Sequence, residues 1–287
     1  MRRISDYCEQ CLREKQRLLC ADSAYLDRVE TLLRERADAD TAPLLVYRFG
    51  QAYEELYGKR PSMAEKKKRF NDLVLSMEEG LRRRIRTSKD PLKTALLMAR
   101  AGNYIDFGAL ADVREETFLA LFDGLSMKKR DERTYESFVR ACERGKNFLL
   151  AADNCGEIVL DKLLLEELER RYPQMEKRVL VRGGEVLNDA TRADAEYAGI
   201  SQVAEILESG NCVAGTVPQM LPEEVRHVLY HSDVILSKGQ GNYESLSGEG
   251  LHVFYLLLCK CELFCTRFGE ELLGGVFVEE GGEPKGA

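Results

Sequence analysis

The distribution of apolar residues changes near residue 145, and no other feature of the chain constrains its fold as strongly. Before this point, apolar residues recur at spacings of three and four with charges between them, which predicts amphipathic helices. After it, short apolar runs alternate with helical segments. An alternation of strands and helices predicts a parallel sheet with helices on both faces. We therefore expect an α/β fold preceded by a helical region.

The expected elements can be placed along the 287 residues from their patterns and their stop signals. Helices are expected at 8–19, 25–37, 41–57, 63–86 and 92–101, and later at 156–171, at 191–207 and after Pro222. Strands are expected at 147–152, 178–182, 211–215, 233–237 and 252–258, with an edge strand at 275–278. These positions predict a helical domain over 1–140, an α/β domain over 141–278 and a disordered, glycine-rich acidic tail over 279–287.

Charge and hydropathy exclude several classes of protein. The chain has 42 basic and 49 acidic residues, a net charge of −7, which disfavours broad binding to nucleic acid. No run approaches the roughly 18 uncharged apolar residues that a membrane-spanning helix needs. Two arginines near the N-terminus are not followed by the apolar block of a secretory signal. We expect a cytoplasmic protein that acts on neither nucleic acid nor membrane.

The cysteines leave two interpretations open. There are nine, an odd number in a chain long enough to fold without disulfides, so reduced thiols are expected. Cys8 and Cys11 have the C-x-x-C spacing of half a zinc site or of a redox pair. Cys259, Cys261 and Cys265 do not have the spacing of a second half. Packing of Cys8 and Cys11 as small apolar side chains is the favoured alternative.

Three clusters of polar residues follow expected strands, at the edge where open α/β sheets bind ligands. Asp153 and Asn154 follow the first strand, Asn188 and Asp189 come after the second, and Lys238 follows the strand at 233–237 and begins a glycine-rich loop. Carboxylate and amide oxygens suit a hard divalent cation, and a lysine beside glycines suits a phosphate. Each cluster alone could equally cap a helix or form a turn. Their combination predicts a metal-dependent site for phosphoryl chemistry.

These clusters lie in longer motifs that resemble those of the metal-dependent damage-control phosphatases, a family long catalogued as a domain of unknown function. The motifs are Ala101-Gly102-Asn103-Tyr104-Ile105-Asp106-Phe107-Gly108, Ala152-Asp153-Asn154-Cys155-Gly156-Glu157, Leu187-Asn188-Asp189-Ala190-Thr191 and Ser237-Lys238-Gly239-Gln240-Gly241-Asn242-Tyr243-Glu244. The resemblance covers nearly the whole chain, and the early Cys8-x-x-Cys11 is typical of the family's prokaryotic branch. It implies a Rossmann-like, mostly parallel sheet sandwiched by helices, with an N-terminal helical bundle domain and a divalent metal at the junction.

The resemblance also implies roles for individual residues. Asp153, Asn154 and Asp189 match the family's metal ligands, and Lys238 matches a lysine that meets the substrate phosphate. Asp153, Asp189 and Lys238 would therefore carry the catalysis. Further polar and glycine positions are implied to line the substrate site: Asn103, Asp106, Glu157, Gly239, Gly241 and Asn242. The metal is expected to be Mg²⁺ or Mn²⁺, with Co²⁺ or Ni²⁺ as alternatives.

The resemblance implies hydrolysis of phosphate monoesters, with sugar phosphates or related, often damaged, metabolites as small-molecule substrates. Water activated by the metal is the favoured nucleophile, because the D-x-D pattern of covalent aspartyl-phosphate enzymes is broken by Cys155. The alternative is a regulatory protein that binds a metal and a phosphometabolite without turnover. A nucleotide-dependent kinase is disfavoured, since no G-x-x-x-x-G-K-[ST] string occurs.

Overall fold

The computed structural model of the chain describes residues 4–104, 122–123 and 125–281. Its centre is a six-stranded sheet with the strand order β3-β2-β1-β4-β5-β6. Neighbouring strands are parallel except for β5 and β6, which are antiparallel. The strands are β1 (Asn147–Ala151), β2 (Glu176–Val181), β3 (Glu205–Glu208), β4 (Val234–Lys238), β5 (Val253–Leu258) and β6 (Gly275–Glu280). The expected α/β class is confirmed.

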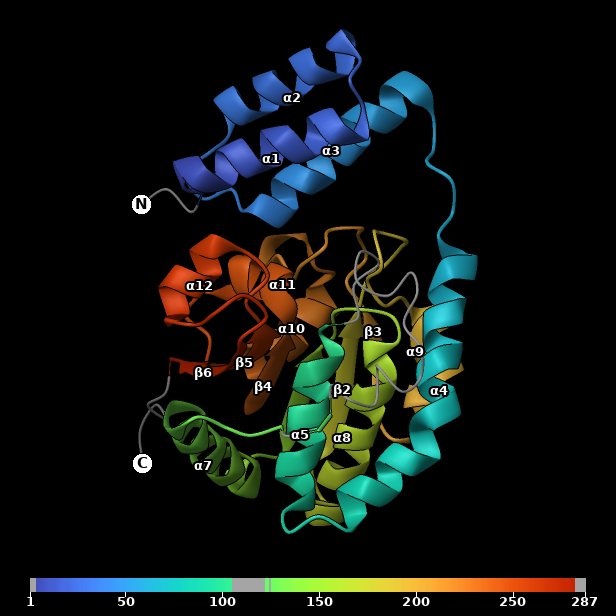
Figure 1. The fold of residues 1–287 in the computed structure, drawn as a ribbon, viewed down its shortest axis with the longest axis vertical. Coiled ribbons are helices and arrows are strands. Elements are labelled where there is room, and N and C mark those ends of the chain that lie inside the picture. The colour runs from blue at the N-terminus through green and yellow to red at the C-terminus, as the bar shows by residue number, and fades with distance from the viewer. Residues whose placement is uncertain (1–3, 105–121, 124, 282–287) are drawn as a thin grey trace.

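Helices cover both faces of this sheet (Figure 1). One face is covered by α4 (Ala64–Arg86), α5 (Pro91–Gly102), α7 (Lys129–Arg144), α8 (Glu157–Arg171) and α9 (Arg192–Ala198). The other is covered by α10 (Glu223–His231), α11 (Gly239–Leu246) and α12 (Glu262–Phe268). Short 3₁₀ helices lie at Ile200–Gln202 and Pro218–Met220. No helix within the described ranges combines the length and the apolar character needed to span a membrane.

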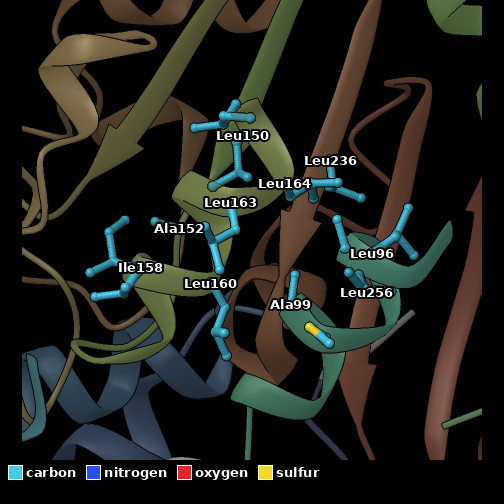
Figure 2. Close-up of a cluster of buried hydrophobic side chains, with 14 of the residues drawn as sticks. Leu96, Ala99, Leu150, Ala152, Ile158, Leu160, Leu163, Leu164, Leu236 and Leu256 are labelled. Carbon is cyan, nitrogen blue, oxygen red and sulfur yellow. The ribbon is translucent and has the colours of Figure 1, made fainter. Parts of the chain in front are cut away.

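The two faces have separate hydrophobic cores because successive side chains of a strand point to opposite sides. In β1, Phe148 and Leu150 belong to the core beneath α5 and α8, whereas Leu149 belongs to the core beneath α10 and α11. Figure 2 shows part of the first core, where Leu160 and Leu163 of α8 lie with side chains of the strands and α5. Strands buried on both faces read as continuous apolar runs, which is why β1, β4 and β5 were predicted correctly.

Close packing of α5 against α8 depends on the glycine that ends α5. A Cβ atom on Gly102 would lie 2.6 Å from Leu160 Cδ1 of α8, so a larger residue would push the two helices apart. At its other end, α5 is fixed by Asp90, whose side chain accepts a hydrogen bond from Lys93 N. The C-terminal end of α5 is thereby held against the start of α8, close to the expected active-site residues.

The first three helices form a bundle with a core of its own. They are α1 (Asp6–Leu19), α2 (Ser23–Glu35) and α3 (Ala42–Tyr57), and they pack around Tyr25, Leu45 and Phe49. The bundle lies at one end of the α/β unit, where α3 contacts α11 (Figure 1). Because α4, α5 and α7 share a core with the sheet, the hydrophobic cores divide between α3 and α4.

Three expectations for secondary structure differ from what is found. The helix expected at 191–207 ends at Ala198, and the last part of that range is the strand β3. This strand lies at the edge of the sheet, where the charged Glu205 pairs with Arg178, so its sequence is not an apolar run. The expected strand at 211–215 is absent, since the Asn211 side chain bonds to the Ser209 and Met220 carbonyls and turns the chain. The tail expected from 279 is not found at its first two residues, because β6 continues to Glu280, and residues 282–287 lie outside the described part of the chain.

Candidate active site

The site is built where the strand order reverses direction. The strands β1 and β4 are parallel neighbours, yet β1 leads into α8 on one face and β4 leads into α11 on the other. Loops that leave adjacent strands on opposite sides open a crevice between them, which is the usual ligand site of such sheets. Asp153 follows β1, and Gly239 follows β4 at the same edge.

Asp153 lies directly against the backbone of Gly239. Its Oδ2 accepts hydrogen bonds of 2.8 Å from Asn103 Nδ2 and of 2.8 Å from Asn154 Nδ2. Gly239 has a φ of +76°, and a Cβ added there would lie 1.9 Å from Asp153 Oδ2. Glycine is therefore required on two counts, for the left-handed backbone and for the space that the carboxylate occupies.

The three expected metal ligands come together through backbone pairing. Asn154 and Asp189 form an isolated antiparallel β-bridge. Ala190 N donates to Asp153 O at 2.7 Å, and the Asn188 side chain donates to Asn154 Oδ1 at 2.7 Å. Asp153, Asn154 and Asp189 thus lie in one hydrogen-bonded cluster although they come from two separate loops.

Leu187 adopts a strained conformation just before this cluster. Its backbone φ is +46°, a value that residues other than glycine rarely adopt. The turn that contains it is closed by a hydrogen bond of 3.0 Å from Asp189 N to Val186 O. Strain of this kind persists where the surrounding structure holds it, and it concentrates at functional sites.

A buried arginine missed in the sequence holds Asp189 in place. Arg182 has no exposed surface, and its Nε donates to Asp189 Oδ2 at 2.6 Å. Its Nη2 donates to Asn242 Oδ1 at 3.1 Å, while the Asn242 amide donates to Ala152 O and to Lys238 O. Asn242, expected to contact substrate, is fully buried and instead ties the ends of β1 and β4 together. Arg182 directly follows the buried strand β2, and a charged residue at that position was the sequence signal that could have identified it.

Acidic groups crowd the site. Burial, together with the negative charges of Glu157 and Asp189, raises the pKa of Asp153 to about 7, against the opposing effect of Lys260 and Arg182. Burial likewise raises the pKa of Asp189, although the adjacent Arg182 guanidinium opposes this shift. Both shifts mean that the described protein charges do not fully compensate these carboxylates, so the site favours an added cation.

The structure corrects the expectation that the Lys238 ammonium points into the cleft. Lys238 is fully buried, and its Nζ donates to Glu157 Oε1 at 2.6 Å, to Asp161 Oδ1 at 2.6 Å and to Ala99 O at 3.0 Å. The reason is strand geometry, since Lys238 lies two residues after Leu236 and so points to the same side, toward α5 and α8.

A second lysine and a helix start lie closer to Asp153. Lys260, just after β5, is partly exposed, and its charge lowers the pKa of Asp153. The helix α11 begins at Gly239 without a side-chain cap, so its first backbone N–H groups have no partner within the helix. Gly241 belongs to this first turn. These groups are suited to the oxygens of a phosphate.

The donor set fits a divalent metal. Two carboxylates and neighbouring amide groups supply the oxygen ligands that Mg²⁺ and Mn²⁺ prefer, and burial, together with nearby acidic groups, raises the pKa of both carboxyls. Asp153, Asn154 and Asp189 would hold the ion. No set of three or more His, Cys, Asp and Glu side chains with metal-binding geometry occurs in the described part of the chain. The set proposed here has only two such side chains, Asp153 and Asp189, because its third member is the amide of Asn154.

The remaining expected positions fall into three groups. Asn103 and Glu157 lie in the cluster, where Asn103 Nδ2 is 3.1 Å from Glu157 Oε2. Asp106 lies outside the described residues. Cys8 and Cys11 are half-buried free thiols on α1. A separate cavity of about 480 Å³ lies between α4, α9 and the loop at Gly183, and none of the three expected metal ligands lines it.

Comparisons with known proteins agree on one family. The family model described as the damage-control phosphatase ARMT1-like domain matches residues 2–274. A damage-control phosphatase of Archaeoglobus fulgidus is 34% identical over 230 residues, which are 78% of each chain. A damage-control phosphatase of Pyrococcus horikoshii is 28% identical over 214 residues, 72% of this chain and 71% of the relative. The crystal structure of a DUF89 family protein from P. horikoshii has a TM-score of 0.79 at 22% identity, covering 96% of this chain and 98% of that one, and so shares the fold.

Proposed function

The chain belongs to the damage-control phosphatase ARMT1-like family, and we propose on this basis that it is a divalent-metal-dependent phosphatase. Its substrates are phosphate monoesters of sugars or of related, damaged metabolites. The observation that supports the metal dependence is the cluster of Asp153, Asn154 and Asp189, in which burial and the negative charge of neighbouring acidic groups raise the pKa of both carboxyls. A cation bound there would offset this excess of negative charge.

Each group of this chain has a separate part in the proposed reaction. Asp153, Asn154 and Asp189 would hold the ion, which when bound supplies positive charge to the phosphoryl group. The N–H groups at the start of α11, from Gly239 to Gly241, bind phosphate oxygens, and Lys260 approaches from the neighbouring strand end. Asp153 and Asp189 are the carboxylates available to accept the proton of the attacking water. The leaving alcohol takes a proton from solvent.

Backbone pairing keeps these groups at fixed positions before substrate binds. The Asn154–Asp189 bridge and the bond from Ala190 N to Asp153 O join the two ligand loops. Arg182 fixes the Asp189 carboxylate from its buried side. Electrostatic groups that need no rearrangement during the reaction stabilise a transition state most effectively.

A screen of sugar phosphates with Mg²⁺, Mn²⁺, Co²⁺ and Ni²⁺ in turn tests this proposal. Phosphate release should require one of these ions and stop with chelator. Asp189→Asn should lower kcat/KM at least about a hundredfold. The matched control is Asp27→Asn, an exposed position on α2 that should retain full activity. Full turnover in chelator refutes the metal dependence, and metal and phosphate-ester binding without any turnover supports the regulatory alternative.

A further inference from the structure

A buried cluster of three charged side chains lies next to the candidate active site, to which Glu157 connects it by hydrogen bonds. Lys238 of β4, Glu157 of α8 and Asp161 of α8 each have no exposed surface. Glu157 and Asp161 are one helical turn apart, so both carboxylates face the end of β4. The Lys238 Nζ lies 2.6 Å from an oxygen of each. Asp161 belongs to none of the motifs that carry the family resemblance.

The Lys238 ammonium has no hydrogen left for a substrate. It carries three N–H donors, and three protein acceptors take them. The third acceptor is Ala99 O near the C-terminal end of α5, 3.0 Å away. This carbonyl needs an outside donor, because Asn103 N bonds to Arg100 O instead. The cation also interacts favourably with the negative end of the α5 dipole.

Glu157 connects this cluster to the expected metal ligands. Its Oε1 accepts from Lys238, and its Oε2 accepts from Asn154 Nδ2 at 2.8 Å and from Asn103 Nδ2 at 3.1 Å. Asn103 and Asn154 in turn both donate to Asp153 Oδ2. A continuous path of hydrogen bonds therefore runs from Lys238 through Glu157 and two amides to Asp153.

The cluster holds more negative than positive charge. Two buried carboxylates share one ammonium, and Asp161 Oδ2 has no hydrogen-bond partner among the described residues. Removal of the ammonium would leave two buried acids side by side, which is strongly unfavourable. Glu157 Oε1 would also lose the hydrogen bond of 2.6 Å that fixes the carboxylate from this side.

We propose that Lys238 is a positioning residue that holds the Glu157 carboxylate in place through its hydrogen bond, so that Glu157 orients Asn103 and Asn154 around Asp153. Asp161 fixes the ammonium on the opposite side, and Lys238 does not contact the substrate phosphate. The proposal rests on the proposed phosphatase function and specifies what one of its expected phosphate ligands does. If Lys238 orients the metal ligands, a second substitution that removes one buried acid should restore activity to a Lys238 variant. If Lys238 binds phosphate, that second substitution cannot restore the lost contact.

Charge repair distinguishes the two roles. Lys238→Met should lower kcat at least about a hundredfold and weaken Mn²⁺ binding in calorimetry at least about tenfold, because two acids then compete below the site. Lys238→Met combined with Asp161→Asn restores the net charge of the wild-type cluster. We expect the double variant to regain at least about tenfold in kcat and to bind Mn²⁺ and inorganic phosphate within about threefold of wild type.

Inhibition by inorganic phosphate distinguishes a positioning role of Lys238 from direct contact between Lys238 and phosphate. If Lys238 binds phosphate, the inhibition constant for inorganic phosphate stays raised at least about tenfold in the double variant, and the proposal is wrong. Absence of any repair of kcat or of Mn²⁺ binding overturns it as well. If wild type shows no metal-dependent phosphate release, the proposed function fails, while the Mn²⁺ affinities still test the positioning role.

Asp161→Leu provides a test that does not require Lys238→Met to fold. It keeps Lys238 but removes one acceptor at similar side-chain size. We expect kcat to fall about tenfold without a change in the inhibition constant for inorganic phosphate, since the ammonium is less well fixed but the phosphate site is intact. An unchanged kcat contradicts the role of Asp161. Thermal melting of each variant shows whether it is folded.

Discussion

Substitution of Gly239 by alanine should disable the site through one methyl group. Gly239 has a φ of +76°, and the added Cβ would lie 1.9 Å from Asp153 Oδ2, well inside van der Waals contact. Asp153 must then move and give up its hydrogen bonds from Asn103 and Asn154. Because Asp153 is an expected metal ligand, metal affinity and turnover should fall together.

The magnitude follows from two separate costs. A residue other than glycine in the left-handed region costs roughly 1–2 kcal/mol. Loss of two hydrogen bonds adds about 0.5–1.5 kcal/mol for each. Gly250 offers a matched control, because its φ is +75° and a Cβ there would meet nothing within 4 Å. Gly250→Ala should therefore show only the backbone cost of roughly 1–2 kcal/mol.

Kinetics, Mn²⁺ calorimetry and chemical denaturation of both variants check this reasoning. Gly239→Ala should lose at least about a hundredfold in kcat/KM and bind Mn²⁺ more weakly, whereas Gly250→Ala should keep both within about threefold. The free energy of unfolding should fall further for Gly239→Ala than for Gly250→Ala. If Gly239→Ala retains wild-type turnover and Mn²⁺ affinity, the close approach of Asp153 to this backbone is refuted.

Further predictions concern other parts of the chain. Lys67→Met should lower the free energy of unfolding by about 3–5 kcal/mol at neutral pH, because it leaves buried Asp194 without its ion pair of 2.6 Å. Burial opposes ionisation of Asp194, but Lys67 and Thr191 together outweigh this effect and lower the pKa of Asp194. The stability lost in the variant should therefore shrink as the pH falls below about 4, which acid denaturation of the variant and of wild type would measure. Lys260→Met should raise the inhibition constant for inorganic phosphate while Mn²⁺ affinity is retained; unchanged inhibition would contradict a phosphate contact. For Cys8 and Cys11 we expect no bound zinc in elemental analysis and unchanged melting of the double serine variant, and a zinc-dependent melting temperature would restore the metal interpretation.

The sequence predicts the fold where burial is uniform and fails where it is mixed. The strands β1, β4 and β5 contain uninterrupted apolar runs at 148–151, 234–236 and 253–258, so these runs are visible without knowledge of their partners. The strand β3 reads Glu-Ile-Leu-Glu, and its identity depends on pairing with β2 in the folded sheet. Helix α11 was interpreted as a glycine-rich loop, since its Gly239 and Gly241 resemble turn signals.

The same limit applies to the candidate site. The expected ligands Asp153, Asn154 and Asp189 are candidates because of their positions after strands, since parallel strands end at a common edge. The partners of Lys238 could not be identified, since Asp161 lies on another element and becomes a neighbour only when α8 packs on β4. The direction of its side chain, however, was available from the alternation along β4, where Leu236 and Lys238 share a face.

The distribution of cations in the site leaves one carboxylate without an ion pair among the described residues. Lys238 forms an ion pair with Glu157, and Arg182 forms an ion pair with Asp189. Within the described ranges, Asp153 forms no ion pair within 4.0 Å and receives only amide hydrogen bonds from Asn103 and Asn154. Two fixed cations thus let three acidic groups stay close together while the charge of Asp153 remains available. Asp153 is therefore the ligand on which a bound cation should depend most.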